Sequence, residues 1–217
     1  MSQFVIVDRA HVEMNGVVLL SEVSFVLGAG RALAVTGANG SGKTTLLRVL
    51  ASTVRPSGGS VLISDAVPDD KSPVFRKQVA ALLGLPPFAR NLTLREHMTL
   101  VATSWGYPLT VALERADEGL ERFRIDRYGQ RFPHELSSGQ TQLFALALTL
   151  IRPMQLLLLD EPEQRLDVDR LGLVGGILRA LVESGTTIIM ASHNEELVHT
   201  VTDARLNLVE GGNVYRG

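Results

Sequence analysis

The sequence contains no cysteine, and this absence excludes every kind of chemistry that depends on a thiol. A chain without cysteine forms no disulfide, has no thiolate metal site and has no cysteine nucleophile. A reducing compartment such as the cytoplasm fits this composition. The chain also lacks an excess of positive or negative charge, because its formal net charge is only −2 for 217 residues. No general basic field attracts nucleic acid, and we expect no nucleic acid partner.

Long hydrophobic runs are missing as well. A membrane-spanning helix needs roughly 20 predominantly apolar residues in a row. The longest candidates, residues 143–151 and 154–159, fall short of this and are separated by Pro153. The first ten residues lack the positive start and the long apolar core of a signal peptide, because Asp8 and Arg9 interrupt them. We therefore expect that the chain does not span a membrane by itself and that any membrane role depends on a partner.

The sequence does contain an alternation of apolar runs, turn residues and segments of helical spacing. Strands are predicted at residues 4–7, 17–20, 23–27, 31–36, 60–64, 78–83, 156–159, 186–191, 205–209 and 213–215. Helices are predicted at residues 44–51, 93–105, 110–124, 139–151 and 168–184. Thr93 and Glu96 form a T-x-x-E capping box at the start of the second helix. Turns are predicted at Asn15 and Gly16, at residues 28–30 and at Gly211 and Gly212.

This order predicts a single α/β domain over residues 1–217. Residues 1–87 and 151–217 would form an α/β core with a mostly parallel central sheet and an N-terminal antiparallel β subdomain. Residues 88–150, in which helical spacing dominates, would form an inserted α-helical subdomain. The all-apolar run at 156–159 suits a central parallel strand that is buried on both faces.

Residues 37–44 read Gly-Ala-Asn-Gly-Ser-Gly-Lys-Thr, the phosphate-binding pattern G-x-x-x-x-G-K-[ST], between a predicted strand and a predicted helix. The glycines let successive backbone N–H groups point at one phosphate chain, and the helix N-terminus adds partial positive charge. The Lys43 ammonium can reach the outer phosphates, and the Thr44 hydroxyl can ligate Mg²⁺. An accidental glycine-rich turn is the alternative, but the strand, loop and helix stand in the required order. Nucleotide contacts are predicted at Gly37, Ala38, Asn39, Gly40, Ser41, Gly42, Lys43, Thr44 and Thr45.

Two further segments carry candidate chemistry. Asp160 and Glu161 end the apolar run, where one acid can hold Mg²⁺ through water and the next can orient or deprotonate an attacking water. Apolar strands often end in acidic residues, so Asp160 and Glu161 alone are a weak signal. They indicate a nucleotide site because the same chain carries the phosphate loop. Residues 136–140 read Leu-Ser-Ser-Gly-Gln before an apolar helix, and they offer hydroxyls and backbone N–H groups as a second anion site. An ordinary serine helix cap is the simpler alternative for these residues taken alone.

The phosphate loop, LSSGQ, LLLLDEP, EPEQRLD and IIMASH occur in an order and spacing that resemble the nucleotide-binding cassette of ABC ATPases. The resemblance covers essentially the whole chain, with LSSGQ standing where the family usually has LSGGQ. It implies the P-loop NTPase fold and two cassettes that pair head to tail around two ATP molecules, the second being another copy or a paralogous cassette. Each ATP would touch residues 37–45 of one subunit and the signature segment of the other, which is Ser137, Ser138, Gly139 and Gln140.

The resemblance also assigns roles near the γ-phosphate. It implies that Asp160 helps to hold Mg²⁺ and that Glu161 is the catalytic carboxylate. Asp167 matches an aspartate that lines the dimer interface. His193 matches the switch histidine that contacts the γ-phosphate.

Two positions depart from the family's pattern. The family usually has an aromatic residue near its start that stacks on adenine, and alignment puts Met14 there, with no Phe, Tyr or Trp between Val5 and Ser24. The family also carries a glutamine that binds Mg²⁺ and relays movement to the membrane partner, and alignment puts Gly84 near that place, Gln78 lying too early inside a predicted strand. We therefore expect intact phosphate recognition, weaker base discrimination and an altered link to the membrane partner.

Three functions compete. In the first, the chain is the ATPase subunit of a transporter, attached to the cytoplasmic face of a membrane through separate transmembrane permease subunits; LTLREHM and TSWGYP resemble exporter-type cassettes. In the second, it is a soluble ABC ATPase of repair, translation or iron–sulfur assembly, although no sustained heptads indicate the coiled coil of the repair type. In the third, it is a binding module without hydrolysis, which Glu161 and His193 argue against. The sequence favours the first.

Overall fold

The computed structural model describes residues 3–209 and 214–216 and contains two sheets. The antiparallel sheet has the order β2-β1-β4, formed by β1 (Gln3–Met14), β2 (Val17–Gly28) and β4 (Gly58–Ile63). The central sheet has the order β5-β6-β7-β3-β8-β9, formed by β5 (Val79–Leu82), β6 (Leu156–Asp160), β7 (Thr187–Ala191), β3 (Ala32–Gly37), β8 (Ala204–Leu208) and β9 (Val214–Arg216). Its first five strands are parallel, and β9 runs antiparallel to β8.

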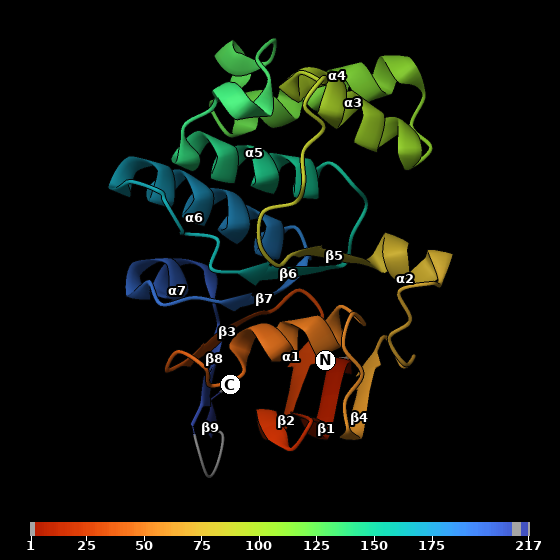
Figure 1. The fold of residues 1–217 in the computed structure, drawn as a ribbon, viewed down its shortest axis with the longest axis vertical. Coiled ribbons are helices and arrows are strands. Elements are labelled where there is room, and N and C mark those ends of the chain that lie inside the picture. The colour runs from red at the N-terminus through yellow and green to blue at the C-terminus, as the bar shows by residue number, and fades with distance from the viewer. Residues whose placement is uncertain (1–2, 210–213, 217) are drawn as a thin grey trace.

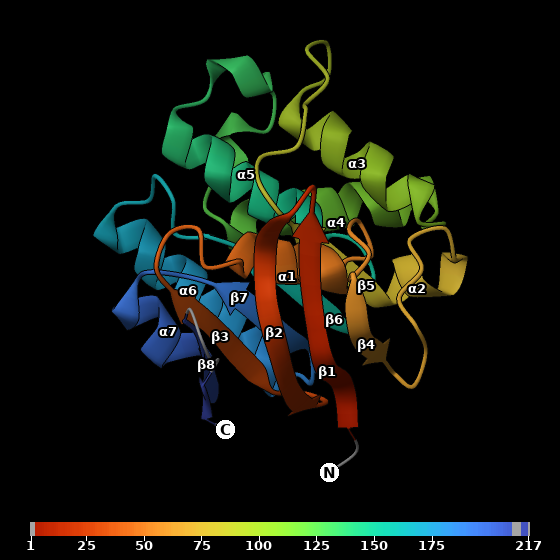
Figure 2. The same ribbon diagram turned by 60° about the horizontal axis from the view of Figure 1, so that its bottom comes forward.

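Helices cover both faces of the central sheet (Figure 1). The helix α1 (Lys43–Leu50) lies between the two sheets, as Figures 1 and 2 both show. The other face is covered by α5 (Ser138–Leu150) and α6 (Val168–Glu183), and α3 (Leu94–Ser104) and α4 (Leu109–Arg122) pack beyond α5. The remaining helices are α2 (Pro73–Gln78), α7 (Glu195–Val201) and the short 3-10 turns Asp126–Tyr128 and Pro133–Glu135.

The strand β6 explains this layering. Its four leucines are all fully buried, and alternate side chains point to opposite faces. Leu156 and Leu158 pack in the core that contains α1, whereas Leu157 and Leu159 pack in the core that contains α5. The prediction of a strand buried on both faces is confirmed. The fold class is also confirmed, with a mostly parallel sheet, an antiparallel β unit and an inserted group of helices.

The first two strands are longer than predicted. Residues 17–20 and 23–27 belong to one strand, β2, because β1 pairs with it on both sides of Ser21 and Glu22, where the register of the ladder shifts. The predicted turn at Asn15 and Gly16 is confirmed, and both residues have positive φ, as a two-residue hairpin turn requires. Shifts of register along the β1–β2 ladder absorb the irregular hydrophobic pattern.

The prediction that Gln78 lies inside a strand is wrong. Gln78 is the last residue of α2, and its side chain donates to the Gln155 Oε1 at 3.1 Å. The short helix α2 begins with a Ser72 cap and with Pro73 in its first turn, where the missing proline N–H costs no helical hydrogen bond. The helix α7 was also not predicted, although Asn194 caps it and Glu195 and Glu196 occupy its first turn.

The other predicted helices form within one or two residues of their expected ends, and the Thr93 capping box is present. The strands β8 and β9 form the predicted terminal hairpin, but its turn at Gly211 and Gly212 lies outside the described residues. The exact division of the chain at residues 88 and 150 stays a prediction. Within the described part of the chain, we find no helix whose length and apolar character would let it cross a membrane.

Candidate functional site

Glycines shape the phosphate loop, residues 37–45, between β3 and α1. Gly37, Gly40 and Gly42 have positive φ values of 140°, 81° and 99°, which other residues adopt only under strain. Gly42 is also tightly packed, because a Cβ atom there would lie 2.8 Å from the backbone oxygen of Leu19. The β1–β2 hairpin therefore packs directly against the loop. This packing holds the loop in one conformation at the N-terminus of α1.

The loop presents its tip to solvent and holds its lysine inside. Ala38, Asn39 and Gly40 are exposed, whereas Lys43 is only 6% exposed. The Lys43 Nζ donates hydrogen bonds to the backbone oxygens of Gly37 and Ala38, each at 2.9 Å. The ammonium group is thus fixed against the loop rather than extended into water. A buried point charge at a helix N-terminus is suited to bind a phosphate group.

Thr44 and Asp160 meet where α1 begins and β6 ends. The Thr44 hydroxyl donates to the Asp160 Oδ2 at 2.7 Å. Both residues offer hard oxygen ligands of the kind that Mg²⁺ prefers. No group of three or more histidine and acidic side chains in the described part of the chain could hold a metal alone. Thr44 and Asp160 are two oxygen donors side by side, and they fit an ion that completes its coordination with water and phosphate oxygens, as Mg²⁺ commonly does.

Burial raises the pKa of the Asp160 carboxyl above its usual value of 3.8, because the charged form loses hydration. The hydrogen bond from Thr44 acts in the opposite direction but is the smaller effect. The neighbouring Glu161 carboxylate raises the pKa further, while Arg48 and Lys43 lower it. Without a bound cation, the ionised Asp160 is therefore a destabilising element of the fold.

Asp160→Asn is expected to flatten part of the pH dependence of stability. An acid whose pKa is raised on folding contributes its full stability below its unfolded pKa of 3.8, and this contribution is lost as the pH rises through the folded pKa. The free energy of unfolding of Asp160→Asn, relative to the unmodified chain, should therefore increase from pH 3.8 towards neutrality. Urea unfolding without nucleotide measures it, with the exposed Asp70→Asn as control. A difference that is independent of pH would contradict the prediction.

Glu161 and His193 face each other at the ends of β6 and β7. The Glu161 Oε1 lies 3.6 Å from the His193 Nε2, and both side chains are partly exposed. Glu161 has a left-handed backbone with φ 48°, and its N–H donates to the backbone oxygen of Ala191 at 2.9 Å. A left-handed non-glycine residue costs about 1–2 kcal/mol, so this strained turn fixes the direction of the carboxylate. The Gln164 amide donates to the same carboxylate.

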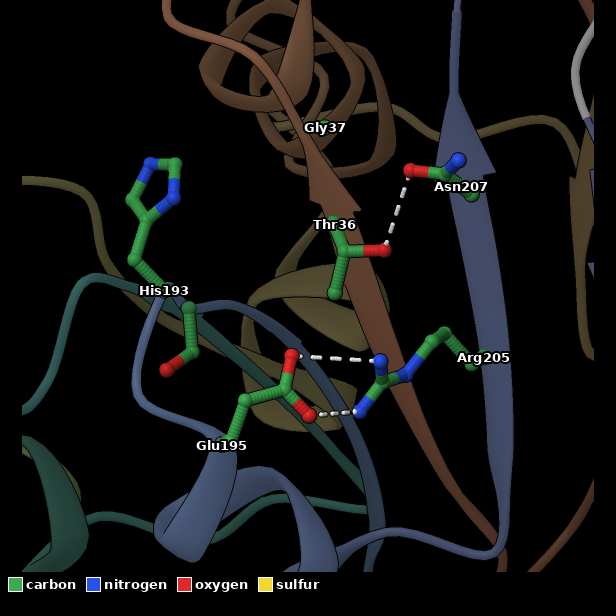
Figure 3. A pocket seen from close by; sticks show the side chains of 7 residues that line it. Thr36, Gly37, His193, Glu195, Arg205 and Asn207 are labelled. Carbon is green, nitrogen blue, oxygen red and sulfur yellow. Dashed lines mark hydrogen bonds and ion pairs between the residues drawn. The ribbon is translucent and has the colours of Figure 1, made fainter.

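A cavity of about 470 Å³ opens beside the start of the loop (Figure 3). Its lining consists of Thr36, Gly37, Ser192, His193, Glu195, Arg205 and Asn207. Across the cavity, the Arg205 guanidinium forms a bidentate ion pair with the Glu195 carboxylate, with N–O distances of 2.6 and 3.2 Å. The Thr36 hydroxyl donates to the Asn207 Oδ1 at 3.3 Å. His193 stands at its edge, so this ring borders both the cavity and the Glu161 carboxylate.

The signature segment lies on the other side of the central sheet, at the start of α5 (Figure 1). Ser137 and Gln140 form a reciprocal capping box, in which the Ser137 Oγ accepts from the Gln140 N–H and the Gln140 Oε1 accepts from the Ser137 N–H. A Cβ at Gly139 would lie 2.7 Å from the backbone oxygen of Arg165. Within one chain the segment is thus a helix cap packed against the stretch before α6.

Asp167 lies in that stretch and caps α6. Its Oδ1 accepts from the Arg170 N–H at 2.9 Å, and its Oδ2 pairs with the Arg170 guanidinium at 3.2 Å. Gly139 lies close to the same guanidinium, since a Cβ there would be 2.8 Å from the Arg170 Nη1. The structure therefore brings together Lys43, Thr44, Asp160, Glu161 and His193 as one group. The signature segment and Asp167 form another.

Met14 and Gly84, the two positions that depart from the family's pattern, have different surroundings in the structure. Met14 is 55% exposed at the end of β1, opposite Val17, and Val17 and Val18 are 58% and 61% exposed. This tip of the hairpin is an apolar patch on the unit that packs against the phosphate loop. Gly84 follows β5 by two residues, has φ 103°, and no atom lies within 4 Å of a Cβ built there. Gln78 cannot replace the missing glutamine, because it lies before β5, at the edge of the sheet opposite Asp160.

The sequence did not reveal Glu163, which the structure ties to the His193 turn. Its Oε1 accepts from the Ser192 hydroxyl at 2.6 Å and from the His193 N–H at 2.9 Å. The signal was a third acid soon after Asp160 and Glu161, but no spacing rule links an acid there to a turn 30 residues later. Only the parallel pairing of β6 and β7 brings the two segments together.

A glycine-rich phosphate loop between β3 and α1 and paired acids at the end of β6, which β7 separates from β3 in the same parallel sheet, define a P-loop nucleotide-binding protein. The particular family follows from the sequence. The chain belongs to the ABC transporter family, whose profile matches residues 20–164, and it is an ATP-binding domain of that family.

Individual relatives agree with this assignment. The Fe(3+) ions import ATP-binding protein FbpC of Brucella melitensis is 32% identical over 199 residues, which are 91% of this chain and 56% of that protein. The cell division ATP-binding protein FtsE of Bacillus subtilis is 27% identical over 206 residues, which are 93% of this chain and 90% of that protein. The chain spans little more than half the length of several curated relatives, 57% in one and 56% in another.

Solved structures share the fold. The dimeric, post-hydrolysis structure of the ATP-binding cassette MJ0796 with ADP and Pi superposes with a TM-score of 0.86. It is 22% identical in sequence, and the match covers 98% of this chain and 99% of that one. At this level of identity the likeness concerns the fold alone.

Proposed function

We propose that this chain is the ATP-binding and ATP-hydrolysing subunit of an ABC membrane transporter. The observation that carries the proposal is the group at the strand ends. There, Lys43 is buried in the phosphate loop, Thr44 is bonded to Asp160, and Glu161 faces His193. A module that only binds nucleotide would not need the last pair. Relatives named as ATP-binding proteins of import and of cell division support the same class of function.

The proposed roles follow from position and charge. The loop N–H groups and the Lys43 ammonium bind the phosphates, and Thr44 and Asp160 hold Mg²⁺. When bound, Mg²⁺ neutralises charge on the phosphate oxygens. Glu161 orients the attacking water and accepts its proton, and His193 donates a hydrogen bond to the γ-phosphate. The strained backbone of Glu161 and its bond from Gln164 hold the carboxylate ready for this step.

The active form is a head-to-tail dimer in the ATP state, formed with a second copy or a paralogous cassette. Two features of the chain and one solved structure support this proposal. The signature segment begins α5, which covers the face of the central sheet opposite α1, so a chain does not present its own signature to its own loop. Of the first N–H groups of α5, that of Gln140 donates to the Ser137 Oγ, whereas those of Ser138 and Gly139 stand too early for an acceptor within the helix and can bind a phosphate of the neighbouring subunit. The MJ0796 cassette of the same fold was solved as a dimer.

The membrane connection is the finer part of the proposal. The chain would lie on the cytoplasmic face of a membrane and contact separate transmembrane permease subunits. The exporter-like character of residues 92–98 and 103–108 stays a prediction, since the named relatives include an Fe(3+) ions import ATP-binding protein. The names of the relatives, which are ATP-binding proteins of import and of cell division, do not favour the alternative of a soluble ABC ATPase.

The direct test is to assay ATP hydrolysis by the purified chain with Mg²⁺ and to purify it from its native membranes with its partners attached. We expect hydrolysis that depends on protein concentration, because the site needs two cassettes. We also expect a polytopic membrane protein to co-purify in stoichiometric amount. A chain that hydrolyses ATP but carries no such protein would be a soluble ATPase, and a chain without hydrolysis in either form would refute the proposal.

Met14→Tyr is expected to tighten ATP binding by roughly fivefold. Stacking a base on an aromatic ring is worth roughly 1–3 kcal/mol, whereas a methionine–ring contact gives about 0.3–1.5 kcal/mol. The exposed patch around Met14 leaves room for the larger ring. Calorimetric Kd values for ATP and GTP measure the effect, with Leu100→Tyr, an exposed substitution on α3, as control. Unchanged ATP affinity, or strong exclusion of GTP by the unmodified chain, would contradict it.

A further inference from the structure

We propose that Glu163 is a positioning residue, whose carboxylate fixes the His193 turn so that His193 and Glu161 keep their mutual geometry. The inference rests on the proposed function in one respect, which is that His193 acts in hydrolysis. It concerns a residue whose carboxylate, among the described residues, hydrogen-bonds to the turn at residues 192–194 and not to residues 37–45 or to Asp160.

One carboxylate oxygen of Glu163 accepts hydrogen bonds from all three residues of the turn between β7 and α7, which are residues 192–194. The Oε1 accepts from the Ser192 hydroxyl at 2.6 Å, from the His193 N–H at 2.9 Å and from the Asn194 N–H at 3.3 Å. The other oxygen is buried and has no hydrogen-bond partner among the described residues. All the hydrogen bonds of this carboxylate in the described chain thus go to residues 192–194. Bonds to an ionised acceptor are stronger than neutral ones, so the turn is firmly tied to residue 163.

These hydrogen bonds from residues 192–194 to Glu163, called the anchor below, matter because few other contacts fix the position of the His193 ring. Its side chain is 45% exposed, and among the described residues its Nε2 has one acidic neighbour, the Glu161 Oε1 at 3.6 Å. The position of the ring therefore depends on the backbone of residue 193, which Glu163 holds. On either side of that backbone, Ser192 is 1% exposed, and Asn194 caps α7 by accepting from the Leu197 N–H at 2.8 Å.

The anchor also belongs to the segment that carries the other catalytic candidate. Glu163 follows Glu161 by two residues, and Gln164 donates to the Glu161 carboxylate. One short segment thus holds Glu161 through residue 164 and the His193 turn through residue 163. A shift of this segment would move both groups together and keep their separation. This coupling is what a site needs when a carboxylate and an imidazole act on the same phosphate group.

The alternative is that Glu163 merely stabilises the fold. Two variants separate the possibilities. Glu163→Leu keeps the size of the side chain and removes both oxygens, whereas Glu163→Gln keeps an acceptor at the Oε1 position and removes the charge. Glu114→Leu, at an exposed site on α4, controls for the loss of a surface glutamate. Thermal unfolding and the stoichiometry of ATP binding establish the folded, binding-competent fraction of each variant.

Hydrogen exchange tests the anchor without reference to activity. In Glu163→Leu we expect the His193 amide to exchange ~10-fold faster or more, because it loses its charged acceptor. The rise at Asn194 should be smaller, because its N–H also donates to the Ser192 Oγ at 3.1 Å. Glu163→Gln and Glu114→Leu should stay within about threefold of the unmodified chain, since the acceptor remains in place. Unchanged exchange at the His193 amide in Glu163→Leu would overturn the inference, and so would a rise spread evenly over all elements.

Kinetics test whether the anchor serves the reaction. Glu163→Leu should lower kcat by ~10–100-fold and change the KM for ATP by less than about threefold, because the phosphate loop is untouched. Glu163→Gln should restore most of the rate. In a His193→Ala background, Glu163→Leu should lower kcat by less than about twofold further, because two residues that act through one group are not additive. Equal losses in both backgrounds would overturn the inference in favour of a purely structural role.

The outcomes distinguish this inference from the proposed function. If His193→Ala is slow and Glu163→Leu is as fast as the unmodified chain, the inference alone is overturned. If His193→Ala hydrolyses ATP at the unmodified rate, the proposed role of His193 fails and the inference fails with it. Faster exchange at His193, slow turnover of Glu163→Leu and the absence of a further loss in His193→Ala together would establish it.

Discussion

Glu161→Gln is expected to lower ATP turnover by ~100-fold or more while ATP binding is retained. Glutamine has the same shape but neither the negative charge nor the basicity that orients the water and accepts its proton. The strained turn at φ 48° is set by the backbone, including the bond from the Glu161 N–H to Ala191, so the substituted side chain keeps its direction. The loss should therefore appear in kcat and not in the affinity of the phosphate loop.

The same variant is expected to remain dimeric in ATP. If two nucleotides bridge the phosphate loop of one subunit and the signature segment of the other, the dimer persists until hydrolysis removes the bridge. Size-exclusion chromatography with light scattering, run with Mg²⁺ and ATP, should show a dimer for Glu161→Gln and a monomer for the nucleotide-free chain. Phosphate release measured on the same samples gives the turnover.

Glu195→Gln is the matched control for this experiment. Glu195 lies two residues from His193 and lines the neighbouring cavity, but it pairs with Arg205 rather than with Glu161. Its side chain is 75% exposed, and exposed ion pairs contribute little to stability. We expect turnover within about twofold of the unmodified chain, because a charge at this site faces Arg205. If Glu161→Gln hydrolyses ATP as fast as Glu195→Gln, Glu161 is not the catalytic carboxylate.

The parts of the site that the sequence predicted are those coded by consecutive residues. The phosphate loop is recognisable because its glycines, Lys43 and Thr44 act through the backbone and helix end that they themselves form. Asp160 is recognisable because the all-leucine run before it specifies a strand buried on both faces. Their contact at 2.7 Å then follows from the packing of α1 against that strand.

The parts that the sequence did not reveal depend on pairs far apart in the chain. Glu163 contacts the His193 turn only because β6 and β7 are neighbours in the sheet. The sequence of neither segment predicts which parallel strand pairs with which. Gln78 was misplaced for a related reason. A run of apolar residues marks a buried strand but not its first residue, and the strand start is set by where α2 ends and where Gln155 accepts its hydrogen bond.

The hairpin near the phosphate loop combines both kinds of information. Asn15 and Gly16 predicted its turn, and the absence of an aromatic residue predicted a weak base contact. The close approach of Leu19 to Gly42 adds what spacing alone does not state, since it joins the hairpin to the loop that binds phosphate. Substitutions on the hairpin can therefore act on the nucleotide in two ways. Those at the exposed tip change base contacts, and those at buried Leu20 disturb the loop itself.

Lys43→Ala is expected to abolish ATP binding, with a Kd raised by ~100-fold or more. Lys43 is 6% exposed, and its Nζ lies within hydrogen-bond distance of two loop carbonyls, where a phosphate group would share the ammonium. Bonds to a charged group contribute about 1.5–3 kcal/mol each, so losing two or more is enough for an effect of this size. Titration of ATP by calorimetry measures the affinity directly, without relying on turnover.

The choice of variants separates loss of charge from loss of loop structure. Lys43→Met keeps most of the aliphatic stem and should bind ATP as weakly as Lys43→Ala, because the ammonium group is what both variants lack. Lys43→Arg should also bind weakly, since the planar guanidinium is larger than the ammonium group and the site leaves only 6% of the lysine exposed. Lys71→Ala, at an exposed position, should leave the affinity unchanged. If Lys43→Met binds ATP normally, the buried ammonium is a structural tie of the loop, and the triphosphate is held by the backbone N–H groups and the start of α1 alone.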